Sequence, residues 1–348
     1  MLIVRPVAPE DLDALESLAA QTGVGLTTLP PDRKFLRKRI KASQASFEKM
    51  IEDPESPGGE AYLFVMEELD EKRIVGVCGI FAKTGGYEPF YSYKIETEHF
   101  KSDQIRIDKA VPILKLYEDH NGPSEVGSLF LHPQFRRAGS GRFLQLVRFL
   151  FVAEYPHLFE PTIITEIRGV SDEQGNSPFW DALGRHFFGI DFKQADYLSV
   201  VNKKFIAELM PDHPIYITML PESARAVIGK PHEQSKKAVE NLQAEGFVFA
   251  NAVDIFDAGP CYQCKRDEIR TVRQSRRGSV VGIAETSSDF EPFMICTTSV
   301  PFRACVGDMT LEASGDVRLP SSAIAALGIG VGKTVRYVAL RAPIAKGG

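Results

Sequence analysis

The sequence predicts an α/β fold, in which a mixed, mostly antiparallel sheet is flanked by helices and followed by a small, mostly β C-terminal module. Short runs with the alternation of a strand are interleaved with segments whose apolar residues recur at helical spacing. The strand-like runs at 61–67 and 73–82 are joined only by a charged turn, which favours an antiparallel pair. Because 348 residues exceed one ordinary core, we expect a large domain over 1–265 and the small module over 266–348.

The first elements follow from apolar spacing and from breaks at proline and glycine. Residues 2–7 alternate as a strand, and residues 9–20 have helical spacing. A second helix is expected over 31–50, because the run DPESPGGE follows it as a strong break. Residues 90–120 hold two strand-like runs, FYSYKIE and IRID, whose pairing stays open at this point.

The middle of the chain gives the clearest unit. The run SEVGSLFLHP predicts a strand, FRRAGSG a turn, and residues 142–159 a helix with one apolar side. A further strand is expected over 162–170, and a second strong helix over 233–244 that stops at Gly246.

The last part of the chain gives shorter signals. Residues 246–260 read as one or two strands, and the polar, basic residues 266–279 as a connecting segment. Strand signals at 293–300 and 334–340 flank LPSSAIAALGIGVG, and they are the reason for expecting a small β module.

Composition limits the possible functions. A net charge of −5 and a pI near 5.9 argue against a nucleic-acid-binding surface. Charged residues from Arg5 to Asp13 interrupt the N-terminus, so we expect neither a secretion signal nor a membrane span. An odd number of cysteines, five, favours a reducing, cytoplasmic location. Cys261 and Cys264 lack a second pair of ligands nearby, so we favour ordinary thiols over a metal site and expect no metal.

The loop after the strand at 124–133 carries the main functional signal. A strand that turns through glycines into a helix leaves backbone N–H groups unpaired at the helix start, where they can bind an anion. Gly139 and Gly141 permit close approach of phosphate oxygens, while Arg136, Arg137 and Arg142 supply charge. An ordinary turn with a solvated basic face is the alternative, because short glycine patterns recur by chance.

Two resemblances bear on this loop. Arg136-x-x-Gly139-x-Gly141 resembles the acyl-CoA pyrophosphate loop of the GNAT N-acyltransferase superfamily, which implies a GNAT-like fold, and SKKAVENLQAEGF at 235–247 resembles a later helix of that superfamily. Over roughly residues 1–260 the chain is also similar to the arginine N-succinyltransferase family. The blocks that carry this similarity are, in order, TGVGLTTLP, EPFYSY, SLFLHPQFR, IRGVSDEQGNSPFW, LGRHFF, FIAELMPDHPIY, VIGKPH and VDIFDAGP.

The family resemblance implies an activity and its partners. Members transfer succinyl from succinyl-CoA to the α-amine of L-arginine, in arginine catabolism by the succinyl route. Succinyl-CoA would thus be a co-substrate, with no tightly bound cofactor, no nucleic acid and no membrane as partners. Members can also work as paired related chains, which implies a homo- or hetero-oligomer.

The resemblance and the chemistry of amide formation together suggest catalytic residues. With the pyrophosphate at the loop, the main chain of Leu129 and Leu131 would run beside the pantetheine arm. The resemblance implies that Leu129 contacts succinyl-CoA. The alternative is that both leucines are simply core residues of the strand. Many GNAT enzymes use a tyrosine on the later helix as proton donor, but the equivalent position is Leu242. His232 matches the histidine that the family uses as proton donor, although a histidine at a helix start can equally be a cap.

Arginine as acceptor needs carboxylates for its guanidinium and a cation for its carboxylate. Glu166 and Arg168 alternate with Ile167, so both would project from one sheet face toward a ligand; an ordinary ion pair is the alternative. Arg168 could also hold the succinyl carboxylate. The candidates for binding the guanidinium are Glu166, Asp172, Glu173, Asp254 and Asp257.

Three functions remain open at the level of sequence. The first is succinyl transfer to arginine, the second is the same chemistry on ornithine or another basic amino acid, and the third is a non-catalytic or regulatory subunit. The long insertion that includes GVSDEQGNSPFW is expected to build the acceptor pocket or a subunit contact.

Overall fold

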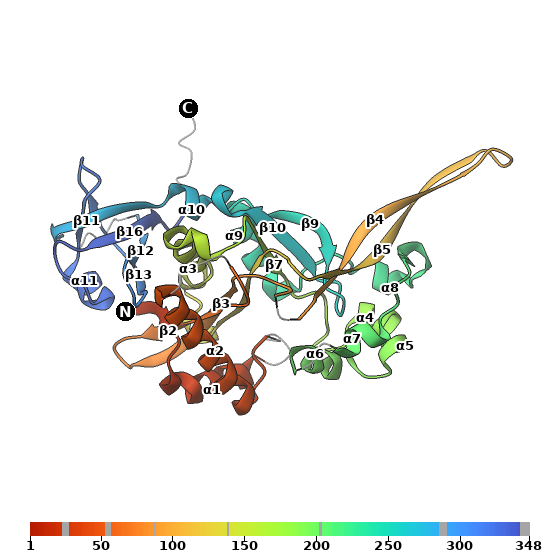
Figure 1. The fold of residues 1–348 in the computed structure, drawn as a ribbon, viewed down its shortest axis with the longest axis horizontal. Coiled ribbons are helices and arrows are strands. Elements are labelled where there is room, and N and C mark those ends of the chain that lie inside the picture. Colours follow the sequence, from red (N-terminus) through yellow and green to blue (C-terminus); the bar gives the residue numbers. More distant parts are fainter. Residues whose placement is uncertain are drawn as a thin grey trace.

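The computed structural model describes residues 1–22, 28–52, 57–86, 88–137, 139–201, 204–284 and 291–341. Residues 23–27 of the block TGVGLTTLP and Ala138 of the glycine-rich loop lie outside the described residues. Within the described part, sixteen strands form one continuous, mostly antiparallel sheet with helices packed against it (Figure 1). This mixed architecture confirms the fold class that the sequence predicts.

The order of strands across the sheet places the earliest strands in its middle. From one edge to the other the strands are β14 (Thr310–Leu311), β15 (Val317–Leu319), β11 (Arg276–Ile283), β16 (Thr334–Ala339), β12 (Phe293–Thr297), β13 (Ala304–Gly307), β1 (Leu2–Pro6), β2 (Ala61–Glu68), β3 (Arg73–Phe81), β6 (Ser124–Leu131), β7 (Thr162–Glu166), β10 (Pro260–Lys265), β9 (Val248–Val253), β4 (Phe90–Ser102), β5 (Ile107–Asp119) and β8 (Ile215–Tyr216).

Helices cover both faces of the central strands. Leu63 and Val65 of β2 pack in one cluster with α1 and α2, whereas Phe64 and Met66 pack in another with α3, as the alternation of a strand requires. The described helices are α1 (Leu12–Gln21), α2 (Arg33–Glu52), α3 (Ser140–Glu154), α4 (Pro178–Ala182), α5 (Gly184–Phe188), α6 (Phe192–Val201), α7 (Lys204–Leu209), α8 (Glu222–Arg225), α9 (Lys236–Ala244), α10 (Arg270–Gln274) and α11 (Ser321–Leu327).

Several expected elements need correction. The helix expected over 142–159 ends at Glu154, and a 3₁₀ turn at Pro156–Leu158 follows because proline cannot continue the helix. The strand expected over 162–170 ends at Glu166. The expected connecting segment over 266–279 instead contains α10 and the start of β11, and the C-terminal module also contains a helix, α11.

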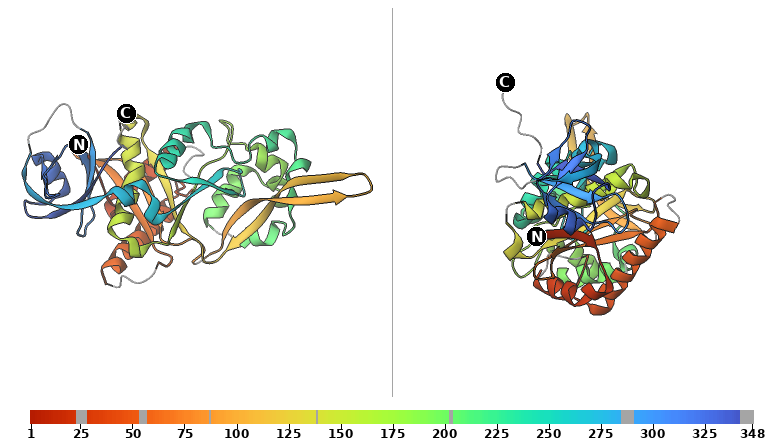
Figure 2. Two further views of the ribbon diagram at one scale, coloured as in Figure 1. Left: turned by 90° about the horizontal axis from the view of Figure 1, so that it is seen from above. Right: turned by 90° about the vertical axis from the view of Figure 1, so that its left-hand side faces the viewer.

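The open question about residues 90–120 has a simple answer. The polar run between the two strand-like segments belongs to the strands themselves, because β4 and β5 pair continuously from Phe90↔Asp119 to Ser102↔Ile107. The resulting hairpin projects from one end of the molecule, and the C-terminal strands lie at the other end (Figures 1 and 2). Far along the hairpin both faces meet water, so the sequence shows no clean alternation there.

The C-terminal strands join the main sheet and also the helix after the glycine-rich loop. β13 pairs antiparallel with β1, so the sheet runs without a break into the last third of the chain. Glu154 at the end of α3 is buried and accepts hydrogen bonds from Arg277 of β11 and Arg336 of β16 at 2.7 Å. These contacts fix α3 against the C-terminal strands. The division into domains at 265/266 stays a prediction.

Candidate active site

The candidate site lies where two parallel strands separate. β6 and β7 pair only at Ser124↔Ile163 and Glu125↔Ile164. A pocket of about 220 Å³ opens beyond this point, lined by 125–129 of β6 and by 165–168, at and just beyond the end of β7. Backbone groups along a strand that has lost its neighbour are available to a ligand. The pocket is therefore a place where an extended chain could lie between the two strands.

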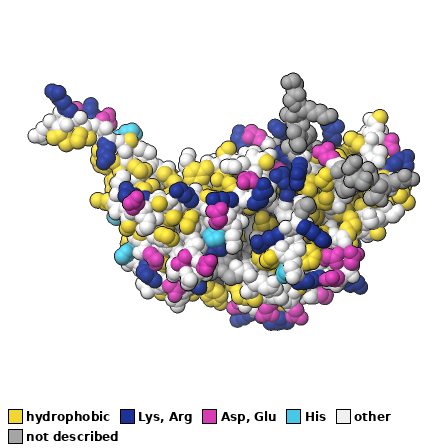
Figure 3. Space-filling model, turned by 180° about the vertical axis from the view of Figure 1, so that it is seen from behind, with side chains coloured by type: hydrophobic (Ala, Val, Ile, Leu, Met, Phe, Trp, Pro, Cys, Tyr) yellow, Lys and Arg dark blue, Asp and Glu magenta, His cyan; other side chains and the backbone are white. Residues whose placement is uncertain are grey.

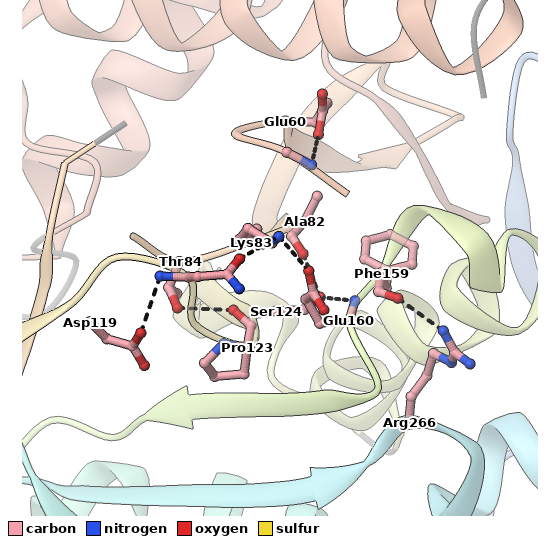
Figure 4. Close-up of polar contacts among 12 residues, drawn as sticks. Glu60, Ala82, Lys83, Thr84, Asp119, Pro123, Ser124, Phe159, Glu160 and Arg266 are labelled. Carbon is pink, nitrogen blue, oxygen red and sulfur yellow. Dashed lines mark hydrogen bonds and ion pairs between the residues drawn. The ribbon is translucent and has the colours of Figure 1, made fainter. Parts of the chain in front are cut away.

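The paired end of the two strands is held by a network of polar contacts (Figure 4). The Ser124 hydroxyl donates to the Ala82 carbonyl at 2.6 Å and accepts from the Glu160 amide at 2.8 Å. The Glu160 carboxylate pairs with Lys83 at 2.8 Å, and Arg266 donates to the Phe159 carbonyl at 2.9 Å. Because one end is held in this way, the strands diverge only toward the pocket.

A bulge in β6 shapes the pocket wall. The register between β3 and β6 shifts between Val77↔Phe130 and Gly79↔Gly127, so that Ser128 and Leu129 lie opposite a single residue. Ser128 has a φ of 52°, rare for a residue other than glycine, and its hydroxyl lies 2.9 Å from that of Thr28. Leu129 lines the pocket, whereas Leu131 is buried at the end of the strand and does not line it.

The glycine-rich loop begins helix α3. Gly139 caps this helix with a φ of 88°, a left-handed conformation that favours glycine. The Ser140 amide donates to the Arg137 carbonyl at 3.0 Å, whereas no described residue accepts a hydrogen bond from the amide of Gly139 or of Gly141. Among the described residues, these two N–H groups at the start of a 15-residue helix are thus without an acceptor, as an anion-binding helix start requires.

The three arginines around this loop differ in their surroundings. Arg136 is exposed, but its Nε donates to the Leu131 carbonyl at 3.0 Å and its guanidinium lies over Phe130. Arg137 is exposed and lies over the Phe135 ring. Burial lowers the pKa of the partly buried Arg142. Several Lys and Arg side chains also gather near the middle of the face shown in Figure 3.

His232 lies beside the pocket and caps a helix start. Its Nδ1 accepts a hydrogen bond from the Gln234 amide at 3.2 Å, and its own amide donates to the Arg168 carbonyl at 2.8 Å. Burial and then the charge of Arg168 lower the pKa of the imidazole. In the neutral ring the proton therefore lies on Nε2. His232 does not line the pocket itself, but Ser235 of the same segment does.

Glu166 and Arg168 both line the pocket, although Arg168 lies just beyond the end of β7. Arg168 donates to the Ser171 hydroxyl at 2.6 Å, and its Nε is buried with no hydrogen-bond partner among the described residues. Burial lowers the pKa of this guanidinium, and the charges of Asp257 and Asp196 oppose that shift. The structure thus places both residues at one cavity.

Two further candidates, Asp254 and Asp257, come from the turn between β9 and β10. The Asp257 carboxylate accepts from the amides of Gly169 and Gly259 at 2.7 and 2.8 Å, and Asp254 accepts from the Asp257 amide at 2.8 Å. Burial raises the pKa of both carboxyls. A Cβ on Gly169 would lie 2.4 Å from the Asp257 carbonyl oxygen, so only glycine allows this close contact between turn and strand end.

Asp196 and Arg148 are among the pocket residues that the sequence reasoning missed. Asp196 comes from α6 in the insertion, and burial, followed by the charge of Asp254, raises its pKa to about 7. Arg148 comes from the third turn of α3 and is 2% exposed. One signal was visible, since Arg148 is a charge inside the apolar run of α3; Asp196 had no comparable signal.

Other expected residues lie elsewhere. Asp172 accepts hydrogen bonds from Asn176 in an exposed turn, and Glu173 is exposed nearby; neither lines the pocket between β6 and β7. Cys261 and Cys264 are free, buried thiols. Among the described residues no group of three or more His, Cys, Asp or Glu could hold a metal ion. None of the described helices has the length and apolar character needed to cross a membrane.

Fold and site together define a class. A mostly antiparallel sheet whose central strand passes through a glycine-rich loop into a helix is the GNAT-like architecture that the loop motif implied, and the chain is an acyltransferase.

Comparisons with known proteins then give the family. The model of the arginine N-succinyltransferase beta subunit matches residues 2–271, and that of its C-terminal domain matches residues 276–339. A Pseudomonas aeruginosa protein named arginine N-succinyltransferase subunit beta is 42% identical, covering 98% of this chain and 99% of the relative. A Yersinia pestis arginine N-succinyltransferase is 40% identical, covering 99% and 100%. The chain belongs to the arginine N-succinyltransferase family.

A solved structure agrees with this assignment. Subunit AI of the arginine/ornithine succinyltransferase from Pseudomonas aeruginosa has a TM-score of 0.90 and 34% sequence identity, covering 98% of this chain and 99% of that one. The likeness extends through the C-terminal strands, where the motifs in the sequence gave no resemblance.

Proposed function

We propose that this protein transfers the succinyl group of succinyl-CoA to the α-amine of L-arginine. The observation that carries the proposal is a pocket between separating strands, with carboxylates and arginines on its wall, in a chain similar over its whole length to arginine N-succinyltransferases. The substrates bring complementary charges, because arginine carries a guanidinium and both reactants carry a carboxylate.

The coenzyme would bind along β6 and the start of α3. The amides of Gly139 and Gly141 and the exposed side chains of Arg136 and Arg137 would hold the pyrophosphate. The pantetheine arm would then lie in the gap between β6 and β7 with the thioester near Leu129, and the Leu131 main chain would lie nearer the loop. Attack by the amine places negative charge on the thioester oxygen, which a backbone N–H at the bulge would stabilise.

His232 would handle the proton. The attacking nitrogen loses one proton and the departing sulfur gains one, so a single residue can move it from one to the other. The lowered pKa keeps the imidazole neutral before the reaction. Its Nδ1 is engaged with Gln234, so Nε2 carries the proton that the departing sulfur would receive, and the same nitrogen would then take the proton that the attacking nitrogen loses.

The acceptor would be held on the β7 side of the pocket. Glu166 and the buried carboxyls of Asp254 and Asp257 are suited to a guanidinium, and Arg168 is suited to the carboxylate of the amino acid. Ornithine is a second candidate acceptor, because the solved relative is named for both amino acids. A related chain as partner is also part of the proposal, since a relative is named as a subunit.

A thiol-release assay tests the proposal. The purified chain is mixed with succinyl-CoA or acetyl-CoA, each with arginine, with ornithine and with no acceptor. We expect release of CoA thiol only with succinyl-CoA and an amino acid, and faster release with arginine. Release that does not depend on an amino acid would contradict the proposal. A chain that binds no succinyl-CoA in calorimetry would point instead to a non-catalytic subunit.

A further inference from the structure

Arg148 is a buried cation that faces the pocket. It lies in the third turn of α3, is 2% exposed, and lines the cavity between β6 and β7. Its Nε donates to the Gln145 carbonyl at 3.0 Å and one Nη donates to the Gly127 carbonyl at 3.1 Å. Both acceptors are neutral, and no described carboxylate forms an ion pair with this guanidinium.

A buried charge without a counter-ion is costly and rare in proteins. The neighbouring titratable group does not relieve this cost, because burial raises the pKa of the Cys78 thiol to about 12 and the thiol is neutral at neutral pH. Arg168, on the opposite wall, differs because Asp257 and Asp196 lie close enough to interact with its charge. Arg148 is therefore the pocket cation that lacks an anion of its own.

The position of Arg148 indicates which anion it would meet. Its hydrogen bond to Gly127 holds the guanidinium next to the bulge at Ser128 and Leu129, where the proposed function places the thioester. The acyl group is attached to that thioester, so its far end must lie in the same small cavity. Resting on the proposed function, we propose that Arg148 binds the terminal carboxylate of the acyl group and selects dicarboxylic acyl-CoA donors over uncharged ones.

The test compares two donors of equal length. Succinyl-CoA and butyryl-CoA both carry four-carbon acyl groups, but butyryl ends in a methyl where succinyl ends in a carboxylate. We expect Arg148→Met to lower kcat/KM for succinyl-CoA about 100-fold or more, as for loss of one partner of a buried charged pair. Turnover of butyryl-CoA should change little, so the preference for succinyl-CoA should collapse. Arg148→Lys, which keeps the positive charge, should recover part of the preference for succinyl-CoA.

Arg168→Met is the matched control, because Arg168 lines the same pocket from the other strand. It should lower kcat/KM for both donors by a similar factor and raise the KM for arginine. If Arg168→Met abolishes the donor preference and Arg148→Met does not, the assignment of Arg148 is wrong. A wild-type enzyme that releases no thiol with any acyl-CoA and acceptor would instead refute the proposed function.

A second measurement covers the case in which Arg148→Met does not fold. Wild-type crystals soaked with succinyl-CoA should show the acyl carboxylate within about 3 Å of the Arg148 guanidinium. A carboxylate bound at Arg168, or one pointing to solvent, would overturn the inference without any variant.

Discussion

The clearest quantitative prediction concerns Asp196, whose carboxyl is the pocket group with a pKa near neutrality. Burial, followed by the charge of Asp254, raises this pKa from 3.8 to about 7, although the charge of Arg168 partly opposes the shift. At a pH between these two pKa values, the Asp196 carboxyl has lost its proton in the unfolded chain but keeps it in the folded protein. Stability is therefore lost as the pH rises from about 4 to 7, and the loss is constant above 7.

Replacing Asp196 with asparagine removes this loss. A pKa displaced from 3.8 to about 7 corresponds to about 4 kcal/mol, at about 1.4 kcal/mol for each pH unit. Water in the open pocket reduces the effect, so we expect Asp196→Asn to raise the free energy of unfolding by about 2 to 4 kcal/mol at pH 8. At pH 4 both side chains are neutral and the gain should nearly vanish.

Urea unfolding followed by tryptophan fluorescence measures this gain directly. Trp180 is the single tryptophan, is fully buried, and packs in the same cluster as Phe192 and Ala195 of α6, the helix that carries Asp196. Asp172→Asn is the control with the opposite sign, because hydrogen bonds from Asn176 lower the pKa of Asp172. A stabilisation by Asp196→Asn of the same size at pH 4 and pH 8 would refute the reasoning.

Three further variants test the loop, the histidine and the attachment of α3. His232→Ala should lower kcat at least about 100-fold, as for loss of a general acid. The control is His186→Ala at an exposed histidine, which should leave kcat near that of the wild type. Near-normal turnover by His232→Ala would remove His232 from the mechanism. Gly139→Ala forces a φ of 88° on alanine and puts its Cβ 3.2 Å from the Leu340 side chain. Because this distorts the loop, the KM for succinyl-CoA should rise roughly 10-fold. An unchanged KM would argue against the loop as the pyrophosphate site. Glu154→Gln leaves the guanidinium of Arg336, which is 14% exposed, without its anion. The free energy of unfolding in urea should therefore fall by about 3 kcal/mol. An unchanged unfolding midpoint would show that this ion pair does not hold α3.

The sequence predicted the central fold well because its signals are local. The strands around Val65 and Val77, and the helix after Gly139, are nearly continuous apolar runs between turn signals, as expected of elements that are buried on all sides. The β4–β5 hairpin could not be paired from sequence, since its outer part is a ribbon solvated on both faces and apolar residues such as Ile105 are exposed. The helix α11 is only seven residues long, which is too short for a clear helical period.

The site was predictable only where its geometry is local. Glycines and arginines mark the loop, and Glu166 and Arg168, which alternate with Ile167 in the sequence, both line one cavity. The bulge at Ser128 gave no glycine signal, because a serine occupies the left-handed conformation there. Asp196 reaches the pocket only through the packing of α6, about seventy residues after β6, and such long-range placement leaves no mark on local spacing.

The raised pKa of Asp196 and the unpaired charge of Arg148 have the same physical origin. On one side, burial and then the charge of Asp254 disfavour the ionised form of Asp196, and on the other side Arg148 has no anion among the described residues. Under the proposed function both defects are relieved by the reactants, since a guanidinium would pair with the carboxylates and an acyl carboxylate with Arg148. The groups that weaken the empty protein are then the ones that distinguish its substrates, as expected where stability is exchanged for function.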